Sequence, residues 1–167
     1  EMAPEFDASY YGFTIHEIRE MQIANMGNYA HGNQPIQHMI YLYNYAGQPW
    51  KAQTRVREVL DKLYTPQADG YCGDEDNGQT SAWYVFSSMG FYPVCPGTDE
   101  YVFGSPLFDK VTMTMQNGKT FTITSSGNSN SNVFVDDIKL NGKDYDANYI
   151  KHQDFLNGGN LEFNMSA

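Results

Sequence analysis

The segment VTMTMQNGKTFTI, residues 111–123, decides the fold class. Apolar and polar residues alternate on both sides of an Asn-Gly dipeptide at 117–118, the pairing most typical of a tight β-hairpin turn. Two short apolar runs at 133–135 and 138–140 continue this pattern, and a second Asn-Gly pair follows at 141–142. The carboxy-terminal part of the chain is therefore predicted to form antiparallel strands.

The earlier part of the chain has helical spacing instead. Apolar residues recur every three to four positions and predict four helices, over 14–26, 35–46, 50–63 and 81–89. Thr14 and Glu17 have the spacing of a capping box, so Thr14 is the predicted N-cap of the first helix. Pro35 suits the first turn of the second helix, and Gly47 ends it.

Helices followed by strands indicate the α+β class. We expect residues 1–95 to form a segment of an α-helical toroid, and residues 96–167 to form antiparallel β-strands of a sandwich-like region.

The net charge excludes some classes of partner. Ten Lys and Arg against 20 Asp and Glu give −10, a field that repels phosphate backbones and anionic lipid. We therefore expect no nucleic acid partner. No apolar run approaches the ~18 residues needed to cross a bilayer, so no membrane insertion is expected either. Aromatic residues make up 15% of the chain, which fits both a carbohydrate binder and a dense core.

The two cysteines and the first residues say less about function. Cys72 and Cys95 could form one disulfide or remain buried thiols, and thiols are favoured because a single pair makes no framework. The acidic start, Glu1 to Pro4, lacks the features of a signal peptide. We expect further polypeptide upstream.

The strongest candidate for chemistry is GDEDNGQTSAWY, residues 73–84. It holds Asp74 and Asp76 between two glycines, which allow the backbone to aim both carboxylates at one point. An EF-hand loop is excluded, because the twelfth position counted from Asp74 is Val85 and not a glutamate. The pair could activate a water molecule, bind a metal, or merely cap the following helix through Asp76 or Asn77.

A second cluster is HGNQP, residues 31–35. The side-chain oxygens of Asn33 and Gln34 could hold a sugar hydroxyl or Ca²⁺, which prefers oxygen ligands. The alternative is a plain N-cap before Pro35. No zinc spacing, nucleophile elbow or phosphate-binding loop occurs in the sequence.

Taken in order, several motifs together resemble the family 92 glycoside hydrolases. They are YGFTIHE (11–17), GNQP (32–35), YLYNYAGQPWKAQ (41–53), GDEDNGQTSAWY (73–84), GFYPV (90–94) and GSPLF (104–108). Members of this family are calcium-dependent, exo-acting α-mannosidases that invert the anomeric configuration. The resemblance covers nearly the whole chain and is weakest after about residue 125. It implies that residues 1–95 are the last helices of an (α/α)6 toroid.

The resemblance implies a role for each candidate residue. Asp76 would be the general base and Asp74 its supporting carboxylate. Asn33 and Gln34 match the segment that builds the metal and terminal-sugar site. The pair His16 and Glu17 looks like the leaving-sugar contact of members that cut α-1,2 linkages.

Two positions depart from the family pattern. Gln34 stands where members often carry a glutamate, so this ligand is neutral here. Thr80 stands where a methionine is usual, a change that we expect to be tolerated.

The resemblance also implies an incomplete active site. The general acid, a glutamate in this family, is expected upstream of Glu1, and neither Glu5 nor Glu20 is a good candidate. We therefore expect the carboxy-terminal part of an α-mannosidase that acts on a mannose-containing glycan, uses Ca²⁺ and is secreted or periplasmic. The 167 residues alone are predicted to be inactive. The alternatives are a calcium-dependent carbohydrate-binding module without catalysis and an inverting α-glucoside hydrolase of similar toroid fold.

Overall fold

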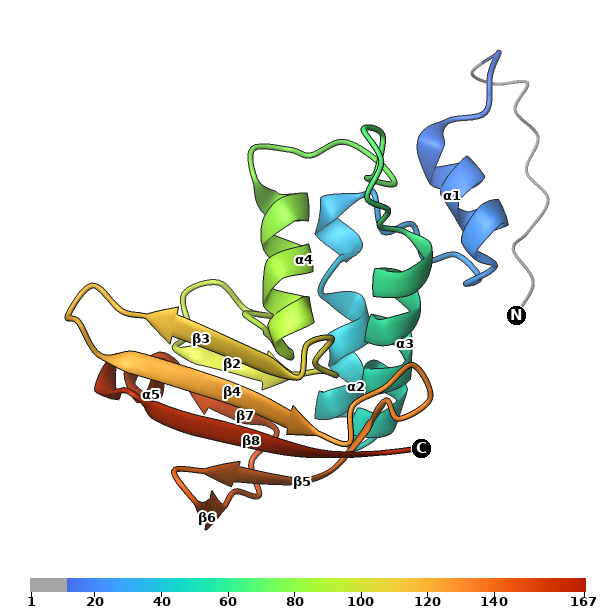
Figure 1. Ribbon diagram of the computed structural model, residues 1–167. Helices are drawn as coiled ribbons and strands as arrows, with labels where there is room; N and C mark the ends of the chain where they lie inside the picture. The colour runs from blue at the N-terminus through green and yellow to red at the C-terminus, as the bar shows by residue number, and fades with distance from the viewer. Residues whose placement is uncertain (1–11) are drawn as a thin grey trace.

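The structure is a computed structural model that describes residues 12–167 (Figure 1). Its helices are α1 (His16–Ala24), α2 (Leu42–Tyr45), α3 (Pro49–Lys62), α4 (Gln79–Met89) and α5 (His152–Asn157), with two short 3-10 turns, η1 (Gln34–Ile36) and η2 (Met39–Tyr41). The strands are β1 (Phe91–Tyr92), β2 (Glu100–Phe103), β3 (Lys110–Thr114), β4 (Thr120–Ser126), β5 (Phe134–Leu140), β6 (Lys143–Asp144), β7 (Tyr149–Lys151) and β8 (Gly159–Ser166). The α+β class is confirmed.

Helices α3 and α4 form as the apolar spacing predicts. Helix α3 buries Val56 and Leu60 on one face, and Leu63, directly after it, is buried too. Helix α4 ends at Gly90, whose φ of 103° gives the left-handed C-cap that glycine adopts without steric cost.

The capping box predicted for the first helix is wrong. Helix α1 begins at His16 after the N-cap Ile15, and no side chain caps it. Glu17 is therefore the second helical residue, one position short of the place from which it could reach back to the N-cap. Instead it lies beside His16, with 3.4 Å between Oε1 and Nε2.

The single helix predicted after Pro35 is also wrong. The chain makes η1, η2 and the short α2 instead. The backbone carbonyl of Gln37 accepts a hydrogen bond of 3.0 Å from the indole Nε1 of Trp83, and its side chain donates to the carbonyl of His31 at 3.1 Å. The first of these bonds engages a carbonyl that a continuous helix would use for itself.

Both predicted hairpins form. Strands β3 and β4 pair antiparallel, as do β5 and β6, within a five-stranded sheet of order β3-β4-β8-β5-β6. Not every pair is antiparallel, because β8 returns parallel to β4 after the intervening helix α5, which the sequence pattern did not predict. A smaller sheet has the order β1-β2-β7.

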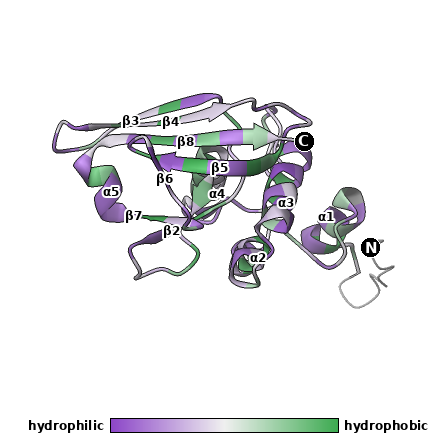
Figure 2. Cartoon of the chain, turned by 90° about the horizontal axis from the view of Figure 1, so that it is seen from below, coloured by the Kyte–Doolittle hydropathy of each residue, from purple (hydrophilic) through white to green (hydrophobic). Residues whose placement is uncertain are grey.

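Two clusters of buried side chains hold these layers together. The first joins the helices around Tyr41, Val56 and Trp83. The second lies between the two sheets and α5, around Phe91, Phe121, Phe155 and Phe163, which accounts for much of the aromatic content. Polar and apolar residues alternate along β8 (Figure 2), and its apolar side chains are buried in the second cluster. The predicted boundary between residues 95 and 96 stays a prediction, and β1 pairs with β2 across it.

Two smaller findings concern the thiols and membranes. Cys72 and Cys95 are both free thiols. Cys72 is half-buried, but Cys95 is exposed, so the expectation of a buried thiol is wrong for Cys95. Among the helices of residues 12–167, none is long and apolar enough to cross a membrane.

Candidate active site

Two glycines bring the candidate segments together. A Cβ added to Gly73 would lie 2.7 Å from the Cα of Gly32, and one added to Gly32 would lie 2.9 Å from the carbonyl oxygen of Cys72. Real Cβ atoms do not approach backbone so closely, so the two segments can cross here only through glycine. The crossing sets Asn33 and Gln34 beside the loop that begins at Asp74.

The side chain of Gln34 fastens this crossing. Its Nε2 donates to the carbonyl oxygen of Asp74 at 2.8 Å and to the hydroxyl of Thr80 at 3.1 Å. Thr80, fully buried, donates to the same Asp74 carbonyl at 2.9 Å. Because the amide nitrogen is used internally, Oε1 is the atom that Gln34 could offer to a cation.

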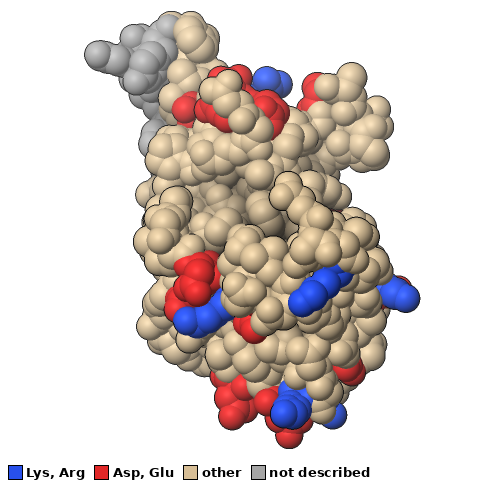
Figure 3. Space-filling view, turned by 90° about the vertical axis from the view of Figure 1, so that its left-hand side faces the viewer, with Lys and Arg blue, Asp and Glu red and all other residues tan. Residues whose placement is uncertain are grey.

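The acidic loop before α4 leaves its two aspartates exposed. Asp74 and Asp76 both face solvent, and acidic side chains gather at this end of the molecule (Figure 3). Asp76, Asn77 and Gly78 have φ values of 50°, 58° and 97°. Asp and Asn tolerate this left-handed region better than most residues, since their short polar side chains can hydrogen-bond locally.

The cap of α4 comes from Glu75 and not from Asp76 or Asn77. Glu75 Oε2 accepts the N–H of Gly78 at 2.6 Å, and Oε1 accepts the N–H of Ser81 at 3.3 Å. Hydrogen bonds from Ser81 and Gly78 lower the pKa of Glu75. The capping alternative for Asp76 and Asn77 therefore does not hold, and the side chain of neither aspartate caps the helix.

His16 and Asp74 line one cavity of about 530 Å³. Its wall also includes Glu20, Cys72 and Gly73, so α1 and the acidic loop face the same space. Glu17 lies beside His16. Asp76, Asn33 and Gln34 are not part of this wall, and they occupy the neighbouring surface around the Gly32–Gly73 crossing.

Glu20 is a member of this region that sequence reasoning considered only as a general acid. It is 4% exposed, and its Oε2 accepts the N–H of Gly32 at 2.7 Å. Oε1 is buried without a hydrogen-bond partner among residues 12–167. Burial raises the pKa of Glu20 to about 7, against the lowering effect of hydrogen bonds from Gly32, His31 and the Cys72 thiol. Its place one turn after His16 and Glu17 on the same helix was the signal for it in the sequence.

A buried histidine fixes the segment before Asn33. His31 Nδ1 lies 2.7 Å from the Tyr29 hydroxyl, and Nε2 lies 2.7 Å from that of Tyr64. Its ring packs edge-on against Trp83 with 4.2 Å between centroids. Burial lowers the pKa of His31 to about 3, so the ring is neutral and structural.

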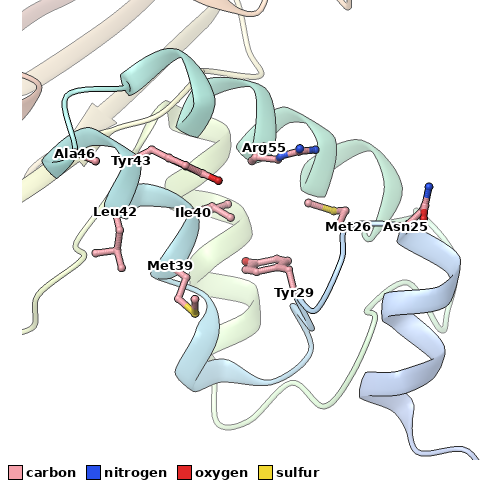
Figure 4. Close-up of a pocket in the computed structure, with 9 residues that line it drawn as sticks. All are labelled: Asn25, Met26, Tyr29, Met39, Ile40, Leu42, Tyr43, Ala46 and Arg55. Atoms are coloured by element: carbon pink, nitrogen blue, oxygen red, sulfur yellow. The ribbon is translucent and has the colours of Figure 1, made fainter. Parts of the chain in front are cut away.

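A larger cavity of about 630 Å³ lies between the end of α1, the η2–α2 segment and α3 (Figure 4). It is lined by Asn25, Met26, Tyr29, Met39, Ile40, Leu42, Tyr43, Ala46 and Arg55. This wall holds no carboxylate, so it offers no acid–base pair, and we place the candidate active site at the smaller, acidic cavity.

The described residues fit Ca²⁺ only as a partial shell. No group of three His, Cys, Asp or Glu side chains within residues 12–167 is arranged to hold a metal. The amide oxygens of Asn33 and Gln34 and the carboxylate of Asp74 are donors of the kind that Ca²⁺ prefers, but this ion takes 6–8 oxygens. Any complete shell would need ligands from elsewhere.

Comparisons with known proteins agree on one family. The model of the glycosyl hydrolase family 92 catalytic domain matches residues 4–167. An inverting mannosidase of family GH92 from Bacteroides thetaiotaomicron is 54% identical, with a TM-score of 0.81 over 98% of this chain and 22% of that one. An α-mannosidase of the same family and organism is 42% identical, with a TM-score of 0.81 over 84% of this chain and 19% of that one.

A curated relative gives the same result. An uncharacterized secreted glycosidase from Arthroderma benhamiae is 34% identical over 137 residues, 80% of this chain and 18% of its own length. The chain thus spans about a fifth of the length of the relatives it matches. It belongs to glycosyl hydrolase family 92, within the catalytic domain of that family.

Proposed function

We propose that this chain supplies the base side of an inverting, exo-acting α-mannosidase that hydrolyses α-1,2-linked mannosides with the help of Ca²⁺. The observation that carries the proposal is that the residues of the acidic loop make different contacts, and only Asp74 and Asp76 leave their carboxylates exposed. Glu75 caps α4, Gln34 and Thr80 hold the Asp74 carbonyl, and the carboxylates of Asp74 and Asp76 stay exposed for chemistry.

In the proposed reaction Asp76 is the general base. It takes a proton from a water molecule whose oxygen forms a bond to the anomeric carbon, while the bond from that carbon to the leaving oxygen breaks. Asp74, two residues away, orients the water. An acid carboxyl about 6.5–9.5 Å across the sugar would protonate the leaving oxygen. We expect this acid from polypeptide upstream of Glu1.

Asn33 and Gln34 would hold Ca²⁺ through their amide oxygens. When bound, the ion supplies Lewis-acid polarisation of sugar hydroxyls and a template for the ring. The protein's own contribution is to fix the position of Gln34, whose Nε2 is already bonded to Asp74 and Thr80.

His16 and Glu17 are proposed to bind the leaving sugar. A neutral sugar hydroxyl can donate to the Glu17 carboxylate and accept from the His16 ring. Support comes from the shared cavity of His16 and Asp74, which sets this pair next to the proposed catalytic loop.

The two solved relatives named as mannosidases favour a mannoside over a glucoside as the substrate. The curated relative described as secreted supports a secreted or periplasmic location. A sugar-binding module without chemistry remains the second candidate, since it would use the same exposed carboxylates.

The test is release of mannose from α-1,2-mannobiose by the intact protein, with and without a chelator. We expect calcium-dependent hydrolysis, inversion at the anomeric carbon seen by NMR, and loss of activity in Asp76→Ala. Binding without hydrolysis would favour the sugar-binding module, and release of glucose from α-glucosides alone would favour the glucosidase.

A further inference from the structure

A single buried carboxyl connects all three segments of the proposed site. Glu20 lies on α1, one turn after His16 and Glu17. Its Oε2 accepts the N–H of Gly32, directly before Asn33. Cys72, two residues before Asp74, meets Glu20 at the same place: a Cβ on Gly32 would lie within 3 Å of both Glu20 Oε2 and the Cys72 carbonyl oxygen.

We propose that Glu20 is a positioning residue of this site, whose carboxyl holds α1, the segment before Asn33 and the segment before Asp74 in one fixed arrangement. The proposal rests on the proposed function, since it concerns the same active site. Glu20 touches no reacting atom in it and acts through the groups that it holds.

The position of Glu20 matters because its carboxyl lies against the close crossing of Gly32 and Gly73. A Cβ on Gly32 would lie 2.8 Å from Glu20 Oε2 and 2.9 Å from the Cys72 carbonyl oxygen, so Glu20, Gly32 and Cys72 meet without spare room. The N–H of Gly32 is buried there with the carboxylate as its acceptor. If the acceptor is removed, that N–H must find another partner or lose its hydrogen bond inside the protein.

A shift of the backbone at the Gly32–Gly73 crossing would displace Asp74 in the proposed active site. Asp74 follows Gly73 directly, and the two line the same cavity as His16 and Glu20. A displacement of about 1 Å between reacting groups can lower a rate by about 100-fold. Loss of the Glu20 carboxyl should therefore reduce kcat through displaced groups rather than through a missing one.

The second carboxyl oxygen argues against a role in folding stability alone. Oε1 is buried without a partner among residues 12–167, a state that costs free energy. A side chain selected only for stability would be apolar at this depth, as its helix neighbours Met21 and Ala24 are. A buried carboxyl with one oxygen bonded to Gly32 and the other without a partner fits a residue whose role is to position the groups around it.

The test compares three variants of the intact protein. Glu20→Gln keeps an acceptor oxygen for Gly32, whereas Glu20→Met keeps the volume and removes the acceptor. Gln53→Ala is the matched control, because Gln53 is also buried and its Oε1 accepts a backbone N–H, that of Val135 at 3.2 Å, away from the site.

Each variant is measured by hydrogen exchange, by steady-state kinetics and by thermal denaturation. Hydrogen exchange reports the protection of the Gly32 amide, and kcat and KM are measured on α-1,2-mannobiose per folded molecule, with Tm alongside. We expect Glu20→Gln to keep protection and stay within about fivefold of the wild-type kcat. Glu20→Met should lose protection and about 100-fold in kcat. Gln53→Ala should lose Tm with kcat unchanged.

The outcomes separate the two proposals. Wild-type protection of Gly32 in Glu20→Met overturns the positioning role, as does a kcat loss no larger than that of Gln53→Ala. If Glu20→Met does not fold, Glu20→Gln decides the question. A loss of about 100-fold in kcat in Glu20→Gln, which keeps an acceptor for Gly32, overturns the positioning role. A wild-type protein inactive on every α-mannoside refutes the proposed function alone, because the exchange measurement needs no substrate.

Discussion

Gln34 and Thr80 are 46 positions apart in sequence, and Gln34 Nε2 donates a hydrogen bond of 3.1 Å to the Thr80 hydroxyl. Both positions are ones at which the sequence predicts a departure from the family pattern. The departures meet in one contact. A carboxylate at position 34 could not donate to the Asp74 carbonyl, which Gln34 reaches at 2.8 Å, so the amide and the hydroxyl act as a unit.

The contact predicts coupling between the two residues. Gln34→Ala and Thr80→Val should each lower the free energy of unfolding by about 1–2 kcal/mol, since each removes a partner from a partly buried hydrogen bond. The double variant should lose less than the sum, with a coupling of about 1 kcal/mol. A double-mutant cycle by urea denaturation measures it, and strictly additive losses would mean that the bond contributes nothing.

Substitutions of Glu75 and Asp76 should have opposite effects: one should lower thermal stability and the other should lower activity. Asp76→Gly removes the proposed base and relieves a left-handed residue with φ of 50°, so Tm should stay equal or rise while mannose release falls by about 1,000-fold or more. Glu75→Ala should lower Tm, because it removes the cap of α4, and reduce kcat far less. Thermal denaturation and mannose release on both variants decide this. An active Asp76→Gly would remove Asp76 from the mechanism.

Local patterns predicted the elements that depend on local chemistry. Helix α3 and both Asn-Gly hairpins follow from side-chain spacing and turn chemistry alone. The break after Pro35 was not predictable in this way, because the carbonyl of Gln37 bonds to Trp83 on another helix. The capping alternative for α4 considered Asp76 and Asn77 and missed Glu75 for a similar reason. The choice between Glu75 and Asp76 depends on the left-handed turn at 76–78, which the sequence only permits.

The site shows the same limit. The pairs Asp74 with Asp76 and Asn33 with Gln34 could be singled out by residue type, and the structure sets their segments side by side. The importance of Glu20 depends on burial against Gly32, which lies twelve residues away on another segment. Helical spacing places Glu20 one turn after His16, but no periodicity reports its contact with Gly32, because that contact arises only when two glycine segments cross.

The crossing itself predicts the effect of a small substitution. Gly73→Ala would set a Cβ 2.7 Å from the Gly32 Cα, so the segments must separate and kcat should fall by about 100-fold. Gly47→Ala is the control: φ there is 69°, but nothing lies within 4 Å of the added Cβ. It should cost only about 1–2 kcal/mol of stability and leave kcat unchanged. Equal kinetics in the two variants would show that the crossing is not tight in solution.

The shifted pKa values of Glu20 and His31 predict that the stability of the folded protein depends on pH in two opposing ways. Burial raises the pKa of Glu20 from 4.5 to about 7, so its contribution is full below pH 4.5 and is lost as pH rises through 7. Burial lowers the pKa of His31 from 6.5 to about 3, so its contribution is full above pH 6.5 and is lost as pH falls toward 3. Between pH 4.5 and 6.5 the two effects oppose each other.

Glu20→Gln removes one of these effects and leaves the other. On acidification from pH 6.5 to 4.5, the free energy of unfolding should fall more steeply in this variant than in the wild type, because His31 is no longer offset. Urea denaturation at three pH values across that window measures the difference, in which groups common to both proteins cancel. Parallel curves would show that Glu20 titrates at its ordinary pKa in the folded protein.

The isolated 167 residues should bind ligand poorly and release no mannose. Asp76 is the proposed base, but cleavage also requires an acid to protonate the leaving oxygen. Of the acids on α1, the buried Glu20 already accepts a hydrogen bond from Gly32. Mannose release from α-1,2-mannobiose by the isolated chain, measured beside the intact protein at matched molar concentration and with Ca²⁺ added, checks this. Turnover by the isolated chain that survives Asp76→Ala would place the chemistry elsewhere. Turnover that disappears in Asp76→Ala would mean that the acid lies within these residues, and Glu17 beside His16 would then be the first to replace.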